Sequence, residues 1–464
     1  MRHNRGTAIM AGRVAVSMVC TLLALSVCVS AGRDSVPDPD VRIAGFGSWE
    51  LGQIVRGFHE DKTIDHAWQQ FTLAHLDIHA DYGRRMRAVV GVEAKTWIPF
   101  IREEANWSTK QSTFTPYLHQ AQGVFDLVGE PERPALRLAA GLMPIKYNSQ
   151  TRNLGEYLFR TRAYPTIILS EFDFPAARLL GLRLSSTLFG SLTQDLLLFS
   201  ERDLEPYYDF SCAWIGAYDI AGAGILTLGA GISLEHLLPV DEELTTPRRP
   251  YQNLYIENPD TLDDGGTVVG DSGYYTFRST KVMGRLSFDP KRMWTDDDAE
   301  DNGIFGTEDL KLYAEGAVLG LKDYPANESQ NNPGYEDIME RIPVMVGFNV
   351  PAFRVLDMLS LEVQWFGSRA PNSYNKVMFS TTLPRAASGS TPEHYTRDDI
   401  KWSVYAQKTL FGFCTLTGQI ASDHLRTEKV GIEHIDTEEN LREPQNWYWR
   451  VKTAFAFQPA WETP

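Results

Sequence analysis

The chain is poor in cysteine and in long apolar runs, and each shortage counts against a class of protein. Only four of its 464 residues are cysteine. Two of these lie in the first 31 residues, and the others, Cys212 and Cys414, are far apart in apolar stretches, which argues against a disulfide framework. After residue 31 no stretch reaches the roughly 18 apolar residues of a membrane helix. A membrane-embedded form of this chain therefore has to be a β-barrel.

Basic residues are also scarce relative to acidic ones, 44 against 60, and the formal net charge is −16. Such an acidic chain repels a phosphate backbone, so we expect no nucleic-acid partner. The sequence contains neither an HExxH nor a GxSxG motif. We therefore expect no enzymatic activity and no cofactor.

The first 31 residues have the order of a secretory signal peptide. Arg2, Arg5 and Arg13 precede an apolar run over residues 14–29, and the small-residue sequence Val29-Ser30-Ala31 follows. Cleavage after Ala31 would remove these three arginines and take the formal charge from −16 to −19. Residues 1–31 are thus predicted to be a signal peptide and the mature protein to be exported.

Apolar and polar residues alternate with a period of two along much of the remaining chain, which is typical of strands. In residues 86–98 the even positions are mostly apolar, whereas Arg87, Glu93 and Lys95 hold odd positions. The alternation recurs near residues 136–142, 180–188, 312–318 and 359–365. Few stretches show a helical period, so the fold class is predicted to be all-β.

The spacing of the strands predicts their topology. We place sixteen strands, which begin near residues 43, 67, 86, 117, 135, 176, 192, 208, 223, 274, 308, 341, 357, 399, 413 and 446. The even-numbered connections are mostly short turns and the long ones are odd-numbered, as in outer-membrane barrels. Residues 290–307 violate the rule, which leaves an extra strand pair or a misplaced boundary open there. The prediction is a transmembrane antiparallel β-barrel over residues 32–457, with a short tail at 458–464.

The last strand carries an aromatic face. Trp447, Trp449, Phe455 and Phe457 share the odd positions of residues 447–457, as the interfacial girdles of a barrel require. With this strand and the loop asymmetry, the chain resembles bacterial porins and porin-like outer-membrane barrels. The resemblance implies a passive channel for small hydrophilic solutes in a bacterial outer membrane. It also implies contact with outer-membrane lipid and lipopolysaccharide, insertion by the barrel-assembly machinery with the four aromatic residues as the assembly signal, and a possible homotrimer.

The third outward-facing loop, residues 144–175, is predicted to form the pore constriction. By the same resemblance this loop folds into the lumen, where a few charges decide which ions pass. Its candidate residues are Lys146, Arg152, Glu156, Arg160, Arg162, Glu171 and Asp173. An ordinary surface loop with solvated charges remains the alternative.

A second set of charges has the phase opposite to the apolar residues and is predicted to line the pore wall. A barrel of about sixteen strands leaves an aqueous channel in which such groups stay hydrated. The basic members are Arg137, Arg183, Lys281, Arg285, Lys401, Arg450 and Lys452, and Glu93, Glu315 and Glu362 are interspersed among them. In a soluble sandwich the same residues would form the solvent face.

Two groups raise the question of a metal. Asp298, Glu300, Asn302 and Asp309 match a calcium loop in part, but position twelve is Asp rather than Glu, so a solvated acidic turn is the favoured interpretation. His75, Asp77 and His79 share one face of a strand, which suits a metal or a proton relay as well as plain hydrated polar residues. We expect no metal. A closed barrel whose loops bind or adhere, and a soluble glycan-binding protein, remain alternative functions.

Overall fold

The computed structural model describes residues 40–59, 62–100, 113–130, 133–159, 176–200, 208–220, 224–245, 254–262, 268–274, 276–293, 304–324, 337–366, 400–425, 440–441 and 443–457. The predicted signal peptide and C-terminal tail lie outside these ranges. Within them, no helix is both long enough and apolar enough to cross a membrane.

Sixteen strands close into one antiparallel barrel, as the sequence predicted. Each pairs with its neighbours along the chain, and β1 pairs with β20 to close the ring. The barrel strands are β1 (Asp40–Arg56), β4 (Ala67–Tyr82), β5 (Met86–Phe100), β6 (Thr113–Glu130), β7 (Arg133–Ile145), β8 (Ala177–Leu188), β9 (Leu192–Ser200), β10 (Phe210–Asp219), β11 (Leu226–Leu238), β14 (Ser279–Phe288), β15 (Leu312–Val318), β16 (Val344–Asn349), β17 (Met358–Trp365), β18 (Ile400–Leu410), β19 (Cys414–Ser422) and β20 (Trp447–Ala456).

The period of two decides which side chains face inward. Val363 on β17 is 51% exposed on the outer surface, while the adjacent Glu362 is 1% exposed within the barrel. On β5, Val92 points outward and Glu93 inward in the same way. Outward valine, leucine and isoleucine recur around the ring, so the barrel has the apolar exterior and polar interior of a transmembrane barrel.

The connections differ in length at the two ends of the barrel. Turns such as residues 83–85 and 411–413 join strands at one end, here called the turn end, and the longer connections lie at the other, the loop end. The connection after β14 is the exception that the sequence also indicated. It lies at the turn end and contains the short helix η2 (Pro290–Met293), and its described parts hold no extra strand.

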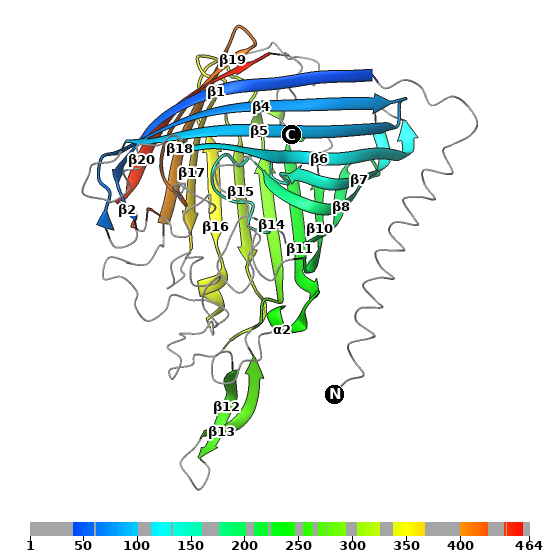
Figure 1. The fold of residues 1–464 in the computed structure, drawn as a ribbon, viewed down its shortest axis with the longest axis vertical. Helices are drawn as coiled ribbons and strands as arrows, with labels where there is room; N and C mark the ends of the chain where they lie inside the picture. Colours follow the sequence, from blue (N-terminus) through cyan, green and yellow to red (C-terminus); the bar gives the residue numbers. More distant parts are fainter. Residues whose placement is uncertain are drawn as a thin grey trace.

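Two short hairpins and two short helices lie in the connections at the loop end. They are the hairpins β2 (Phe58–His59) with β3 (Lys62–Thr63) and β12 (Leu254–Leu262) with β13 (Val268–Tyr274), and the helices α2 (Glu242–Thr245) and η4 (Ile338–Arg341). Figure 1 shows the β12–β13 hairpin projecting well beyond the barrel below α2. Neither hairpin belongs to the barrel sheet.

The seam between β1 and β20 is closed by the predicted aromatic end of the chain. Phe457 donates its backbone N–H to the carbonyl of Gly45 at 3.1 Å. Its ring lies directly over Gly45, because a Cβ at that position would come within 2.2 Å of Phe457 Cζ. Val451, Phe455 and Phe457 are exposed on the outer surface, which confirms the outward phase of the odd positions.

Part of the lumen is filled by an apolar core. The connection after β7 enters the barrel, and its residues 146–159 are called the infolded loop below. Leu154, Leu158 and Phe159 of this loop are buried with inward-facing Met283 and Met345 of the wall in one cluster. Each such burial contributes roughly 1.5–3 kcal/mol, so apolar contact holds the loop inside.

Candidate functional site

The infolded loop crosses the lumen from β7 to the diametrically opposite wall. β17 lies eight strands from β7 in either direction around the ring. Glu362 of β17 accepts hydrogen bonds from the backbone N–H groups of Arg152 at 2.6 Å and of Asn153 and Leu154 at 2.9 Å. The phenol of Tyr313 donates to the same carboxylate at 2.9 Å. Successive backbone donors that converge on one carboxylate form an anion-binding nest, with the anion supplied here by the wall.

Glu315 of β15 anchors a second point of the loop. It accepts from the phenol of Tyr147 at 2.6 Å, the side-chain amide of Asn148 at 2.7 Å and the backbone N–H of Tyr157 at 2.8 Å. Burial and the neighbouring Glu315 raise the pKa of both the Tyr147 and the Tyr157 phenol well above its usual value, so both remain protonated donors. The buried glutamate is thus matched by three donors, as a buried charge requires.

The far end of the loop holds two further contacts with the wall. Asn153 donates its side-chain amide to Asp423, which also accepts from the phenol of Tyr448 at 2.7 Å. Tyr157 donates to Gln364 on β17 at 2.9 Å. The loop is therefore tied to β15, β17 and the end of β19, and the barrel wall fixes its path.

Three of the seven predicted constriction residues lie in described parts of the chain, and they differ in position. Lys146 borders the lumenal cavity and donates to the carbonyl of Thr151 at 2.9 Å. Arg152 donates to Met358 Sδ at 2.8 Å and to Glu308 at 3.3 Å, which tethers the loop near the turn end of β17. Glu156 is 1% exposed and accepts the backbone N–H of Asn148. Arg160, Arg162, Glu171 and Asp173 lie outside the described residues.

The Glu308 end of this tether is a compact charge cluster outside the strands. Burial alone would raise the pKa of Glu308, but Lys311 at 2.7 Å and Arg152 together lower it. The carboxylate therefore stays ionised between two cations. It links the infolded loop to the long connection at the turn end.

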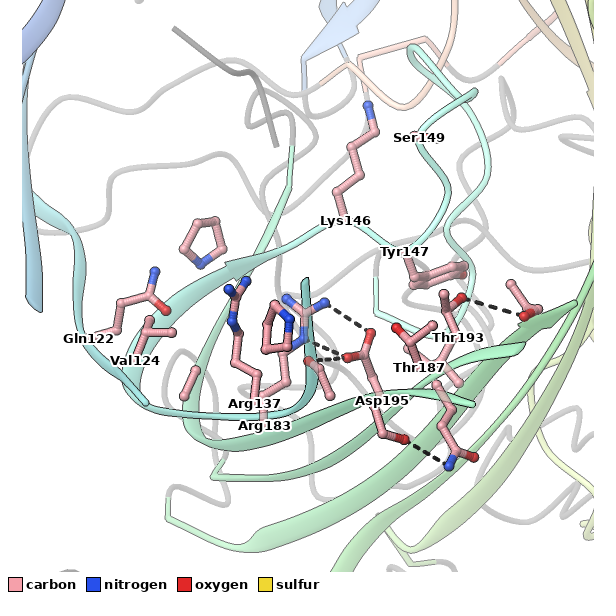
Figure 2. A pocket seen from close by; sticks show the side chains of 18 of the residues that line it. Gln122, Val124, Arg137, Lys146, Tyr147, Ser149, Arg183, Thr187, Thr193 and Asp195 are labelled. Atoms are coloured by element: carbon pink, nitrogen blue, oxygen red, sulfur yellow. Dashed lines mark hydrogen bonds and ion pairs between the residues drawn. The ribbon is translucent and has the colours of Figure 1, made fainter. Parts of the chain in front are cut away.

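Between the loop and the turn end lies a cavity of about 1600 Å³. Figure 2 shows Lys146, Tyr147 and Ser149 of the infolded loop on one side of it, with Arg137, Arg183 and Asp195 on the strands opposite. Its border carries seven basic residues and two aspartates: Arg42, Arg87, Arg133, Arg137, Lys146, Arg183 and Arg285, with Asp77 and Asp195. The cavity is therefore a polar vestibule with a surplus of positive charge.

Several of these arginines are held by acidic neighbours. Arg183 makes two hydrogen bonds of 2.9 Å to Asp195, drawn as dashed lines in Figure 2. Arg137 donates to Asp126 at 2.6 Å, and Arg42 and Arg87 both pair with Asp81. Counting Asp81 and Asp126 with the border residues leaves the basic groups in the majority. These ion pairs orient the guanidinium groups around the vestibule.

The remaining predicted wall residues also point inward, but they lie away from the vestibule. Lys281 pairs with Glu235 at 3.1 Å, and neither side chain is exposed. Lys401 donates to the carbonyl of Leu441. Arg450 donates to Gln419 at 2.7 Å, and Lys452 is paired in register with Glu50 of β1. Of the predicted basic wall, Arg137, Arg183 and Arg285 alone border the cavity.

The structure describes one of the four candidate residues of the calcium loop and all of the histidine cluster's strand. Asp298, Glu300 and Asn302 lie outside the described residues, while Asp309 accepts backbone N–H groups from Gly306 and Ala352 and so organises a turn. In contrast, His75 is brought together with Glu93 and His119, residues that the sequence analysis did not group with it.

A closed antiparallel barrel with an apolar exterior, a charged interior and a loop folded across its lumen defines a porin-like transmembrane β-barrel. No family model and no curated protein matches the sequence. Among solved structures, a triple mutant of Rhodopseudomonas blastica porin aligns with TM-score 0.42 and 8% identity over 90% of this chain and 100% of that one. A structure titled "Asymmetric conductivity of engineered proteins" aligns with TM-score 0.40 and 8% identity over the same shares.

Proposed function

We propose that this barrel is an outer-membrane channel for passive diffusion of small hydrophilic solutes. The observation that carries the proposal is the infolded loop, which the carboxylates of Glu315, Glu362 and Asp423 tie across the lumen. A loop held in this way narrows the water-filled path to a defined width. It also places Lys146 at the border of the cavity, where permeating solutes would meet it. In this assignment the loop end faces the outside and the turn end faces the periplasm.

The charge of the vestibule supports a preference for small anions. Seven basic residues border it, against two aspartates. In a pore with low-dielectric walls such a surplus concentrates anions and repels cations. The prediction applies to permeation through the lumen, whereas the net acidity of the whole chain has no direct bearing on it.

Planar-bilayer recordings of the purified protein test the proposal directly. We expect steady single-channel conductance and a reversal potential on the anion-selective side in a salt gradient. Lys146→Gln should move the reversal potential toward cations. The matched control is Arg278→Gln, because Arg278 is exposed at the loop end in a pair with Glu242. A folded, membrane-inserted protein without conductance would refute the channel.

That negative result would favour the second candidate, a closed barrel that presents its loops for binding or adhesion. Its support is the apolar core formed by the infolded loop and the wall inside the lumen, together with the projecting β12–β13 hairpin. Insertion through the aromatic residues of β20 and assembly into a homotrimer are proposals under either function. Recovery in the outer-membrane fraction and the size of the detergent-solubilised complex test them.

A further inference from the structure

Three neighbouring strands place two imidazoles and a carboxylate together on the inner wall. His75 of β4 lies with its Nδ1 2.8 Å from Glu93 Oε1 of β5, and His119 Nδ1 of β6 lies 3.6 Å from Glu93 Oε2. The two imidazole rings meet edge to face, with centroids 5.0 Å apart. One ligand atom from each residue lies within 4.8 Å of the other two.

A β-bulge brings His119 into this group. In the β5–β6 ladder Gly91 pairs with Gln120 and Val92 with Leu118, so His119 is an extra residue between two paired ones. As a result His119 and Gln120 both border the lumenal cavity, although adjacent strand residues normally face opposite ways. Bulges are common beside functional sites, where they redirect a side chain.

We propose that His75, Glu93 and His119 form a zinc-binding site that opens into the vestibule. Imidazole and carboxylate are preferred Zn²⁺ ligands at about 2.0–2.2 Å, which places the ligand atoms of one tetrahedral ion about 3.4 Å apart. The observed separations bracket that value, so small side-chain rotations suffice. The side chain of His75 is 3% exposed and that of His119 is 13% exposed, so the site is sheltered yet open on the cavity side. The fourth position faces the cavity and is available to water or a solute.

The surroundings supply the second layer of contacts that such a site needs. His75 Nε2 lies 2.8 Å from Asp77, which in turn accepts from Gln120 Nε2 at 2.7 Å. With zinc on Nδ1, His75 donates its Nε2 proton to Asp77, the carboxylate–histidine–metal arrangement that orients metal ligands. Gly91 leaves the space for this, because a Cβ there would lie 2.3 Å from Asp77 Oδ1.

The negative charge around His75 also favours a bound divalent cation. Asp77 and Glu93 both contact His75 and are 6% and 5% exposed. These two buried carboxylates concentrate negative charge at the cluster. A divalent ion supplies a balancing positive charge, and because zinc binds its ligands in their deprotonated form, binding should release protons. The alternative is a purely structural hydrogen-bond network around His75.

The test uses the folded barrel in detergent, purified without a polyhistidine tag. Zinc titration against a chromophoric chelator should give one ion per chain, with proton release in weakly buffered solution near pH 7. Cobalt(II) in place of zinc should give the intense visible absorption of a tetrahedral site. His119→Ala and Glu93→Gln should weaken zinc binding at least tenfold, and Asp77→Asn by about 10–100-fold.

The control is His79→Ala, because His79 borders the same cavity on the same strand but is not part of the group. It should bind zinc as the unaltered protein does. A difference in gel migration between unheated and heated samples verifies that each variant is folded. The proton-release and cobalt measurements on the unaltered protein remain decisive if a variant misfolds. Absence of stoichiometric zinc, or equal losses in the His79 and His119 variants, would overturn the proposal.

Discussion

Glu362 and Asn153 are 209 residues apart in sequence, yet the backbone N–H of Asn153 lies 2.9 Å from the Glu362 carboxylate. This glutamate on β17 thereby anchors part of a loop that starts on the opposite wall. Its other partners in the infolded loop, the backbone N–H groups of Arg152 and Leu154, flank Asn153 in the chain. Glu362 is therefore one of the three carboxylates, with Glu315 and Asp423, that hold the loop across the lumen.

Glu362→Gln should loosen the infolded loop without unfolding the barrel. The amide nitrogen that replaces one carboxylate oxygen cannot accept a hydrogen bond, so at least one backbone N–H of residues 152–154 loses its partner. The loss should cost about 1–3 kcal/mol of stability. We expect larger and noisier conductance and faster proteolysis within the loop. Glu50→Gln is the matched control, since among the described residues Glu50 pairs with Arg450, at 3.5 Å, and not with the infolded loop. Equal effects of the two variants would contradict the anchoring role.

Two glycines on the outer face of β1 should respond differently to alanine. At Gly45 the new Cβ would lie 2.2 Å from Phe457 Cζ and 2.3 Å from the His75 carbonyl, whereas at Gly47 it meets nothing within 4 Å. Gly45→Ala should therefore lower the temperature at which the barrel loses its compact gel migration, and Gly47→Ala should not. If both variants behave alike, Phe457 does not cover the seam as described.

Arginine should be costly on the outer face and tolerated on the inner one. Leu196, in the middle of β9, is 48% exposed to the outside, while Thr193 of the same strand borders the cavity (Figure 2). Leu196→Arg should destabilise the barrel by roughly 2–4 kcal/mol if it lies near the bilayer midplane. Thr193→Arg should leave stability nearly unchanged. Urea unfolding in lipid vesicles measures both, and the reverse order would invert the assignment of faces.

The turn before β17 should give stability a pH dependence. Burial alone would raise the pKa of Asp357, but the backbone N–H of Thr409 and the ammonium of Lys408, at 3.1 Å, lower it below the ordinary value of 3.8. A depressed pKa means that the ionised carboxylate stabilises the fold at higher pH and that this stability is lost as the pH falls through the folded-state pKa. Unfolding midpoints of Asp357→Asn and the unaltered protein should thus differ near pH 7 and converge below about pH 4. A constant difference would contradict this role.

The barrel itself could be predicted because the alternation of inward and outward side chains is a property of each strand on its own. Every strand has one face toward an apolar medium and one toward the lumen, so apolar and polar residues alternate along its sequence with a period of two. Leu361, Glu362 and Val363 were assigned to the correct faces on this ground alone. Even the long connection at the turn end was visible as a departure from the pattern.

The anchors of the infolded loop could not be predicted in the same way. Glu315 and Glu362 were recognised as inward-facing, but nothing in a period of two indicates that a loop far away in sequence supplies their donors. Asp423, which follows β19, gave no signal at all. His119 was missed because the bulge that turns it inward breaks the alternation by which inward residues are recognised.

The closure of the ring has a consequence for how the chain folds. Gln53 and Trp449, neighbours across the seam, are 396 residues apart, whereas most other strand pairs are joined by a nearby connection. In an unfolded chain, loop-closure entropy makes that contact about 4 kcal/mol less favourable than closing a four-residue turn. Hairpins that form one after another along the chain shorten the effective separation of β1 and β20, so these two strands should pair last. Until then the protein is a curved open sheet with two unpaired edges, the state in which pairing with another chain competes with its own completion.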